Sequence, residues 1–314
     1  MPTSDARPLR VALGPAGRTR FGASAIEAGG GVVVALDGAP QGLVWMDPRD
    51  VDPLRQLLAA TPSVLWVQLP WAGVEAIAAT GIFRDRSDLT WTCAKGVYAE
   101  EVAEHALALT LACLRLLPER ARATSWPPLG GRSLFGLRVL VLGGGGITES
   151  LLRLLAPFGC DVTVLRRSPD ALTGARRVVG PDALDAVLPD ADVLVVALAL
   201  TPETAAMIGG AELALLPAGA VVVNVARGAH IVTDDLVAAL ESGHLGGAGL
   251  DVTDPEPLPD DHPLFSAPNC VVTPHQANTA EMAEPVLRRR ITENVRRWIA
   301  GEPLLGLVDP EVGY

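Results

Sequence analysis

LRVLVLGGGGIT, residues 137–148, is the stretch that decides the fold. Its first half is an apolar run typical of a strand buried on both faces, and its second half is a glycine-rich turn that leads into a helical stretch. Strand, turn and helix in this order are the setting in which a Gly-x-Gly-x-x-Gly motif binds the pyrophosphate of a dinucleotide. Gly143 would make the tight turn, and Gly145 would let the backbone approach the pyrophosphate. The amides near Gly146 and Ile147 would donate to it at the positive end of the helix.

The sixth position of this motif departs from the usual pattern, because Thr148 stands where a glycine is expected. That glycine permits close packing of the helix on the strand, so a Cβ here predicts an outward shift of the helix and a weaker cofactor site. The competing interpretation of the whole turn is a flexible connection that binds no ligand.

The end of the next strand indicates which dinucleotide would bind. An acid at this place normally accepts hydrogen bonds from the ribose hydroxyls of NAD. Here the segment VTVLRRSPD places Arg166 and Arg167, followed by Ser168, at that point. Guanidinium groups bind a 2′-phosphate in a bidentate way, which favours NADP(H), with NAD(H) as the alternative. If both arginines are simply solvated, they carry no information about the cofactor.

Length and patterning together predict two domains. The chain has 314 residues, of which 49% are hydrophobic, and a single core stops growing at roughly 250–300 residues. Short Val- and Trp-rich runs alternate with helical stretches throughout, which is typical of doubly wound α/β domains with parallel sheets. The amphipathic stretch at 283–302 is expected to return to the first domain. We therefore predict a discontinuous domain of residues 1–95 and 277–314 and a Rossmann domain of residues 96–276.

One long helix is predicted at residues 99–122, where apolar residues recur at helical spacing. It is long enough to cross from one domain to the other. A linker is predicted after it, marked by Pro127, Pro128, Gly130 and Gly131.

Charge and composition exclude several classes of protein. The net charge of −11 argues against binding to nucleic acid, which needs clustered basic residues. The apolar runs are far shorter than the ~20 residues of a membrane span, and the start has no signal-like apolar region. The four cysteines show no Cys-x-x-Cys spacing, and the histidines lack the spacing of metal ligands. We expect a cytoplasmic protein without a metal site that acts on a small molecule.

Three short segments each deliver one ionisable residue after an apolar strand. NVARG carries Arg227, LDVTDPEP carries Glu256 and TPHQAN carries His275. A cation, a carboxylate and an imidazole are the groups needed to bind a carboxylate substrate and move a proton. Glu256 lies in a proline-stiffened loop, and a carboxylate bonded to an imidazole fixes its tautomer. The alternative for each residue is an ordinary exposed side chain.

With these motifs, the chain resembles the D-isomer-specific 2-hydroxyacid dehydrogenase family and its glyoxylate/hydroxypyruvate reductases. The resemblance runs from about Leu69 to Ala277 and includes AGVE, VAEHALALTLACLR, LGGGGIT, LTPETAAMIG, NVARG, LDVTDPEP and TPH. It implies a flavodoxin-like substrate-binding domain beside the Rossmann domain. It also implies a homodimer joined through the long helix that follows the hinge.

The resemblance also implies an activity, the reversible reduction of a small 2-keto acid to its D-2-hydroxy acid by hydride transfer. His275 would then donate the proton, Glu256 would be its partner, and Arg227 would bind the carboxylate and keto oxygen of the substrate. Backbone amides around Trp71, Ala72 and Gly73 would hold the substrate carboxylate, and the cofactor would be contacted by Leu198, Ala226 and, near the nicotinamide, Asp251. The alternative is a non-enzymatic dinucleotide sensor or corepressor on the same fold.

Overall fold

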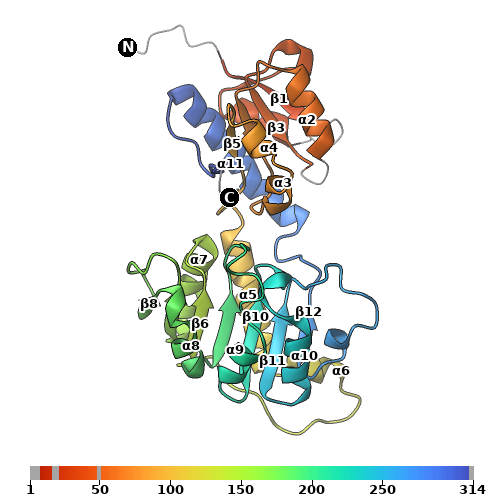
Figure 1. Ribbon diagram of the computed structural model, residues 1–314, viewed down its shortest axis with the longest axis vertical. Coiled ribbons are helices and arrows are strands. Elements are labelled where there is room, and N and C mark those ends of the chain that lie inside the picture. The colour runs from red at the N-terminus through yellow and green to blue at the C-terminus, as the bar shows by residue number, and fades with distance from the viewer. Residues whose placement is uncertain (1–7, 16–20, 48–50, 311–314) are drawn as a thin grey trace. The chain divides into compact units, whose positions relative to one another are not determined.

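The computed structural model describes residues 8–15, 21–47 and 51–310, and the chain divides into two compact units. Unit 1 comprises Met1–Tyr98 and Thr279–Tyr314, and unit 2 comprises Ala99–Asn278. Each unit is built on one sheet of parallel strands with helices on both faces, which confirms the predicted fold class (Figure 1).

Unit 1 contains a five-stranded sheet in the order β2-β1-β3-β4-β5, which is the flavodoxin-like order. Its strands are short, and their side chains are mostly buried: β1 (Arg10–Gly14), β2 (Val32–Val33), β3 (Gly42–Trp45), β4 (Trp66–Gln68) and β5 (Thr90–Thr92). The helical elements are α1 (Gly22–Ala28), the 3-10 turn η1 (Leu36–Gly38), α2 (Val51–Ala60), α3 (Glu75–Ala78), α4 (Ile82–Asp85) and α11 (Ala280–Ala300).

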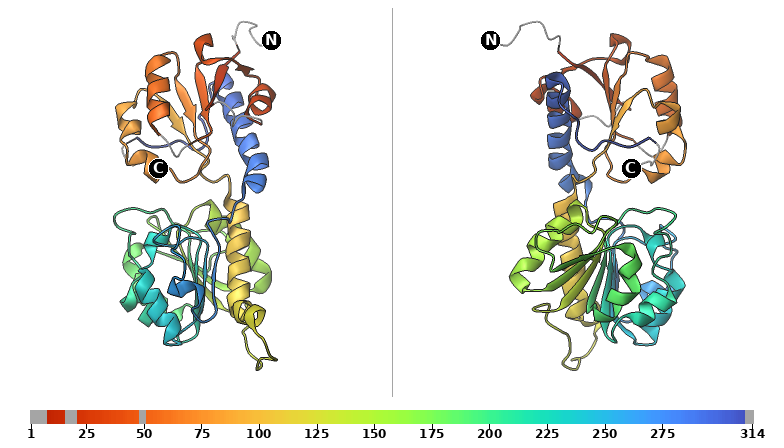
Figure 2. Two further views of the ribbon diagram at one scale, coloured as in Figure 1. Left: turned by 90° about the vertical axis from the view of Figure 1, so that its right-hand side faces the viewer. Right: turned by 60° about the vertical axis from the view of Figure 1, so that its left-hand side comes forward.

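Helix α11 belongs to unit 1 because its apolar side packs against α1 and the sheet. Leu287, Ile291 and Val295 are buried in one cluster with residues of α1 and β1. At Gly29 an added Cβ would lie 2.6 Å from the carbonyl oxygen of Thr292, so the two helices touch where no side chain intervenes. The chain therefore returns to unit 1 after it has completed unit 2 (Figure 2).

Unit 2 contains a seven-stranded sheet in the order β12-β11-β10-β9-β6-β7-β8. The strands are β6 (Arg138–Leu142), β7 (Asp161–Leu165), β8 (Arg177–Val179), β9 (Val193–Val196), β10 (Ala220–Asn224), β11 (Leu245–Leu250) and β12 (Cys270–Val272). The chain leaves β6 toward β7 on one side and then returns to β9 on the other. The carboxyl ends of β6 and β9 thus form the switch point at which such sheets bind ligands.

Helices cover both faces of this sheet (Figure 2). The α-helices are α5 (Ala99–Leu114), α6 (Leu117–Arg122), α7 (Gly146–Leu155), α8 (Leu184–Val187), α9 (Gly210–Leu215) and α10 (Thr233–Glu241). The 3-10 turns are η2 (Ala156–Phe158), η3 (Pro181–Ala183), η4 (Leu188–Asp190), η5 (Gly228–His230) and η6 (Pro263–Phe265). Helices α5 and α7 share one buried cluster with the sheet, and α9 and α10 share the other.

The predicted helix at 99–122 is wrong as a single element, because the structure divides it into α5 and α6. Leu116, between them, has a left-handed φ of 54°, and the carbonyl of Leu114 accepts a hydrogen bond from the amide of Arg132. The predicted linker therefore lies within unit 2, where it forms the long loop beyond α6 (Figure 1). The short strand β8 was not predicted at all. Among the described residues, no helix has the length and hydrophobicity to cross a bilayer.

Candidate active site

The glycine turn between β6 and α7 has the geometry that a dinucleotide requires. Gly143 has a φ of 105°, and an added Cβ would lie 2.3 Å from the carbonyl oxygen of Ala197 and 3.0 Å from the Cα of Leu198. Only glycine fits this position without strain. Leu198, predicted to contact the cofactor, therefore lies directly beside the turn, at the carboxyl end of β9.

The next residues leave room for a ligand at the start of α7. Gly145 is the exposed N-cap of this ten-residue helix, and no described atom lies within 4 Å of the Cβ that a side chain would add. Gly146 and Ile147 form the first turn of the helix, where backbone amides have no partner within the helix. These features fit a pyrophosphate, because amides and the helix dipole both favour a negative charge there.

Thr148 is accommodated in this turn by a hydrogen bond. Its side chain is fully buried, and its Oγ1 donates to the carbonyl oxygen of Gly143 at 2.8 Å. The hydroxyl thus connects the first turn of α7 to the glycine that ends β6. The buried hydroxyl of Thr148 therefore has a partner. Without one, burial of the hydroxyl would destabilise the fold.

We predict that Thr148→Val weakens the binding of NADPH, since valine has nearly the same shape but removes the donor to Gly143. Loss of one such hydrogen bond costs about 0.5–1.5 kcal/mol, so the Kd should rise about 2–10-fold. Thr148→Ser keeps the hydroxyl and is the matched control, with a Kd close to that of the wild type. Calorimetric titration with NADPH measures both, and equal affinities for the valine and serine variants would contradict the prediction.

Arg166 lies against the glycine turn at the end of β7. An added Cβ on Gly144 would come within 2.5 Å of its Cδ, so the stem of the side chain covers the turn. Arg167 and Ser168 follow and are exposed. A hydrogen bond from Thr201, and the charge of Arg167, lower the pKa of the exposed Glu203. Arg167, which follows β7, therefore lies close to the loop after β9. Strands β7 and β9 are the two neighbours of β6, which carries the glycine turn.

His275 and Glu256 form a hydrogen-bonded pair. Nδ1 of His275 is 2.7 Å from Oε1 of Glu256, and the two side chains are 47% and 42% exposed. A carboxylate only accepts, so Nδ1 carries the proton of this bond. The other ring nitrogen, Nε2, is consequently the atom that can exchange a proton with a substrate.

The turn that carries His275 is anchored by Asp251. The φ of His275 is 50°, and its amide donates to the carbonyl oxygen of Asp251 at 2.8 Å. The Asp251 carboxylate accepts from the amides of Gln276 and Ala277 at 2.9 and 3.0 Å. Burial raises the pKa of Asp251, but these hydrogen bonds and those from His105 and Thr273 outweigh it and bring the pKa to about 2. The structure thus turns this carboxylate toward the His275 loop.

Arg227 is held by its backbone at the carboxyl end of β10. Its carbonyl oxygen accepts from Nδ2 of the buried Asn224 at 2.8 Å and lies 2.9 Å from Nδ1 of the buried His230. Oδ1 of Asn224 accepts from the amide of Ala226, which is also predicted to contact the cofactor. Sequence reasoning missed Asn224 and His230, although an asparagine directly after three valines was a usable signal.

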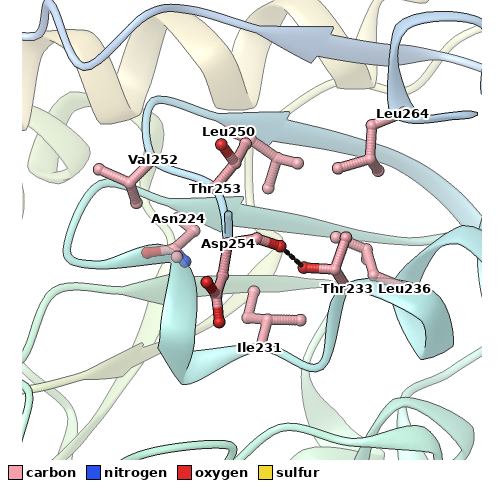
Figure 3. Close-up of a pocket in the computed structure, with 10 residues that line it drawn as sticks. Asn224, Ile231, Thr233, Leu236, Leu250, Val252, Thr253, Asp254 and Leu264 are labelled. Carbon is pink, nitrogen blue, oxygen red and sulfur yellow. Dashed lines mark hydrogen bonds between the residues drawn. The ribbon is translucent and has the colours of Figure 1, made fainter. Parts of the chain in front are cut away.

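The loops that carry Arg227 and Glu256 are packed backbone to backbone. An added Cβ on Gly228 would lie 1.9 Å from the carbonyl carbon of Thr253. Close by, Oγ1 of Thr233 donates to the carbonyl oxygen of Asp254 at 2.6 Å. Figure 3 shows the small pocket beside this contact, whose apolar lining comes from α10, the end of β11, η6 and the segments that follow β10 and β11. The two loops therefore support each other at the edge of the sheet.

The predicted catalytic residues follow three adjacent strands. Arg227 comes after β10, Glu256 after β11 and His275 after β12, and these strands pair in parallel, so all three lie at the same edge. Within the described ranges, no group of three or more His, Cys, Asp or Glu could hold a metal.

The predicted substrate loop lies in unit 1, after β4. Trp71 and Ala72 are exposed and Gly73 is half-buried. The carbonyl oxygen of Trp71 accepts from the amide of Ala94 at 2.9 Å, so the loop is tied to the segment that follows β5. The contact of these amides with a substrate carboxylate stays a prediction.

Known proteins match this arrangement. Residues 107–277, more than half of the chain, match the NAD binding domain of the D-isomer specific 2-hydroxyacid dehydrogenases. Glyoxylate/hydroxypyruvate reductase A from Yersinia enterocolitica is 30% identical over 288 residues, 88% of each chain. The crystal structure of a D-isomer specific 2-hydroxyacid dehydrogenase from Xanthobacter autotrophicus Py2, in complex with NADPH and MES, is 31% identical and superimposes with a TM-score of 0.82, covering 98% of this chain and 100% of that one.

A third similar protein is the NADPH-dependent glyoxylate/hydroxypyruvate reductase from Sinorhizobium meliloti, solved in complex with NADP and sulfate. It is 25% identical, with a TM-score of 0.78 over 97% of this chain and 99% of that one. Sequence similarity and overall fold thus agree. The chain belongs to the D-isomer specific 2-hydroxyacid dehydrogenase family.

Proposed function

We propose that this NAD(P)-dependent 2-hydroxyacid dehydrogenase uses NADPH to reduce a small 2-keto acid of the glyoxylate or hydroxypyruvate type to the D-2-hydroxy acid. The observation that carries the proposal is the 2.7 Å pair of His275 and Glu256 at the same sheet edge as Arg227. An acid–base pair beside an arginine is what reduction of a keto acid requires, because one group must supply a proton and another must hold the carboxylate. The relatives named as reductases of glyoxylate and hydroxypyruvate support this substrate class.

In this proposal, the reaction adds a hydride to C2 of the keto acid, and the bound nicotinamide supplies that hydride. Protonated His275 donates from Nε2 to the developing alkoxide, since Nδ1 is engaged by Glu256. The carboxylate of Glu256 stabilises the imidazolium before transfer and keeps the ring in one orientation. Arg227 binds the substrate carboxylate and stabilises negative charge on the keto oxygen as it develops.

The choice of NADPH rests on Arg166 and Arg167 at the end of β7. Both follow the strand where NAD-specific proteins carry an acid, and Arg166 covers the glycine turn. Two guanidinium groups can pair with a 2′-phosphate, and each such charged hydrogen bond is worth about 1.5–3 kcal/mol. Relatives were solved with NADPH and with NADP, which supports the same choice.

We predict that the Arg166→Ala/Arg167→Ala double variant loses its preference for NADPH. The ratio of kcat/KM for NADPH to that for NADH should fall about 10²-fold or more, since both charged contacts to the phosphate are removed. Arg153→Ala is the matched control, because Arg153 lies on the exposed side of α7 and pairs with Glu100. An unchanged ratio in the double variant would show that the two arginines do not bind the phosphate.

The experiment that tests the function is the oxidation of NADPH and NADH by purified protein with glyoxylate, hydroxypyruvate, pyruvate and phenylpyruvate. Turnover with glyoxylate or hydroxypyruvate is the expected result, and chiral analysis of the product should give the D-isomer. Binding of NADPH without turnover of any of the four acids would instead favour the dinucleotide-sensing alternative. Absence of both turnover and binding would contradict the proposal.

The proposal also includes a homodimer, supported by the loop beyond α6. Three of its large apolar side chains are mostly exposed to solvent: Trp126 is 96% exposed, Leu129 100% and Phe135 66%. A cluster of this kind marks an interaction surface, and a second copy would bury it. We expect the wild type to sediment as a dimer and Trp126→Asp/Leu129→Asp to sediment as a monomer. A monomeric wild type at micromolar concentration would contradict this assignment.

The four cysteines support a cytoplasmic location for the enzyme. All are free thiols, and Cys93, Cys113 and Cys270 are buried. Burial raises the pKa of the Cys113 and Cys270 thiols to about 12, which keeps them protonated and unreactive. Free thiols of this kind are typical of proteins in a reducing compartment.

A further inference from the structure

His105 lies in the second turn of α5 and has no part in the proton transfer proposed above. Its Nε2 is 2.9 Å from Oγ1 of Thr273 and 3.4 Å from Oδ1 of Asp251, which lie 168 and 146 positions further along the chain. The side chain is largely buried, at 22% exposure. Helix α5 therefore reaches, through this imidazole, the segment that carries His275.

The donors and acceptors in this cluster can be assigned from the chemistry. A threonine hydroxyl has one proton, and Oγ1 of Thr273 lies 2.6 Å from Oδ1 of the ionised Asp251, a length typical of a charge-assisted bond. The hydroxyl proton therefore goes to Asp251, and the oxygen has only lone pairs left for His105. Nε2 of His105 must then carry a proton and donate it. The chain of hydrogen bonds runs from His105 to Thr273 to Asp251, and Nε2 of His105 also faces Oδ1 of Asp251 directly at 3.4 Å.

This chain ends at the backbone of the acid–base residue. Asp251 binds three successive amides, that of His275 through its carbonyl oxygen and those of Gln276 and Ala277 through its carboxylate. His275 has a left-handed φ of 50°, a conformation that is uncommon for residues other than glycine and that hydrogen bonds around the turn can stabilise. The orientation of Asp251 thus decides whether this turn, and with it the direction of the imidazole, is kept.

We propose that His105 is a positioning residue for the reaction: by donating from Nε2 to Thr273, it orients the Asp251 carboxylate that holds the turn of His275. The inference rests on the proposed role of His275. Without the Nε2 donor of His105, the Thr273 hydroxyl is no longer held with its proton toward Asp251. The Asp251 carboxylate, and with it the His275 turn, can then adopt other conformations. A displaced catalytic group slows the chemical step but leaves the glycine turn, which follows β6, untouched.

The test is a set of His105 variants measured by steady-state kinetics and by titration with NADPH. His105→Phe removes the donor and should lower kcat about 10–100-fold, since misplacement of a reacting group by an ångström can cost about 10²-fold. The Kd for NADPH should change far less than kcat, because the glycine turn that would bind the pyrophosphate follows β6. His105→Gln offers an amide donor and should recover kcat to within a few-fold of the wild type. His244→Phe is the matched control, because His244 also bonds a partner, the carbonyl oxygen of Leu213, but is not connected to the His275 loop.

A double-mutant cycle separates positioning from a general loss of stability. If His105 acts through Thr273, the effects of His105→Phe and Thr273→Val on kcat should be far from additive, because either change breaks the same chain. Additive effects, an unchanged kcat in His105→Phe, or no recovery in His105→Gln would each overturn the proposal. Imidazole NMR signals of His275 give a readout without turnover, and they should shift in His105→Phe but not in His244→Phe. A wild type inactive on every keto acid would refute the proposed function, whereas an active wild type with unperturbed His275 signals in His105→Phe would refute only the positioning role.

Discussion

His275→Gln is expected to lower kcat for the reduction of glyoxylate or hydroxypyruvate by about 10²–10⁴-fold, the usual contribution of general acid catalysis. Glutamine can still accept and donate hydrogen bonds, but it cannot give up a proton at neutral pH. The bond between Nδ1 and Glu256 leaves Nε2 as the donor to the alkoxide, so no other nitrogen of the ring can replace it. The Kd for NADPH should not change, because His275 follows β12 and the glycine turn follows β6.

His244→Gln serves as the control for this prediction. It makes the same substitution at a half-buried histidine that bonds only a backbone carbonyl at the other end of β11. Steady-state rates and NADPH titration should be normal in that variant. A His275→Gln enzyme that keeps most of the wild-type kcat would show that the proton comes from another group.

Arg227→Ala should have the second large effect, on kcat/KM for the keto acid. Loss of one partner of a hydrogen-bonded charge pair costs about 2–5 kcal/mol, which corresponds to roughly 10²–10⁴-fold. Both KM and kcat should change, because the guanidinium binds the carboxylate in the ground state and the keto oxygen more strongly as charge develops. Arg227→Lys keeps the positive charge but loses the planar, forked guanidinium. Its kcat/KM should therefore lie between those of the wild type and Arg227→Ala.

Arg132→Ala is the matched control, since Arg132 also lies in unit 2 but pairs with Asp192 at the amino end of β9. Its kcat/KM should equal that of the wild type. If Arg227→Ala retains the wild-type kcat/KM for every small keto acid, the substrate carboxylate is bound elsewhere and the assignment of Arg227 is wrong.

The parts of the site that the sequence predicts are those carried by strand ends. Arg227, Glu256 and His275 each follow an apolar run, and parallel pairing brings such ends to one edge of the sheet. The glycine turn is visible for the same reason, because its strand and helix are adjacent in sequence. Local pattern was therefore sufficient to predict that these residues lie at one end of the parallel sheet, while their roles in the reaction stay predictions.

The supporting residues could not be predicted in this way. His105 meets Thr273 across 168 positions, and His230 meets the loop after β9 across 31, so no local periodicity reports either contact. The helix breaks after α5 because Pro118 has no amide to donate to the carbonyl of Leu114, which accepts from Arg132 instead. This proline was a local signal that the apolar pattern concealed. Strand β8 was missed because it has only three residues, two of them partly or fully exposed.

The contact between Gly228 and the peptide of Thr253 limits how this enzyme can diverge. With 1.9 Å between a new Cβ and a carbonyl carbon, no side chain of any size can enter, and neither loop can be reshaped without moving the other. A substitution that displaces the loop of Arg227 is therefore expected to displace the loop of Glu256 as well. The loop at Trp71 is exposed, so its side chains can vary at less cost to the fold.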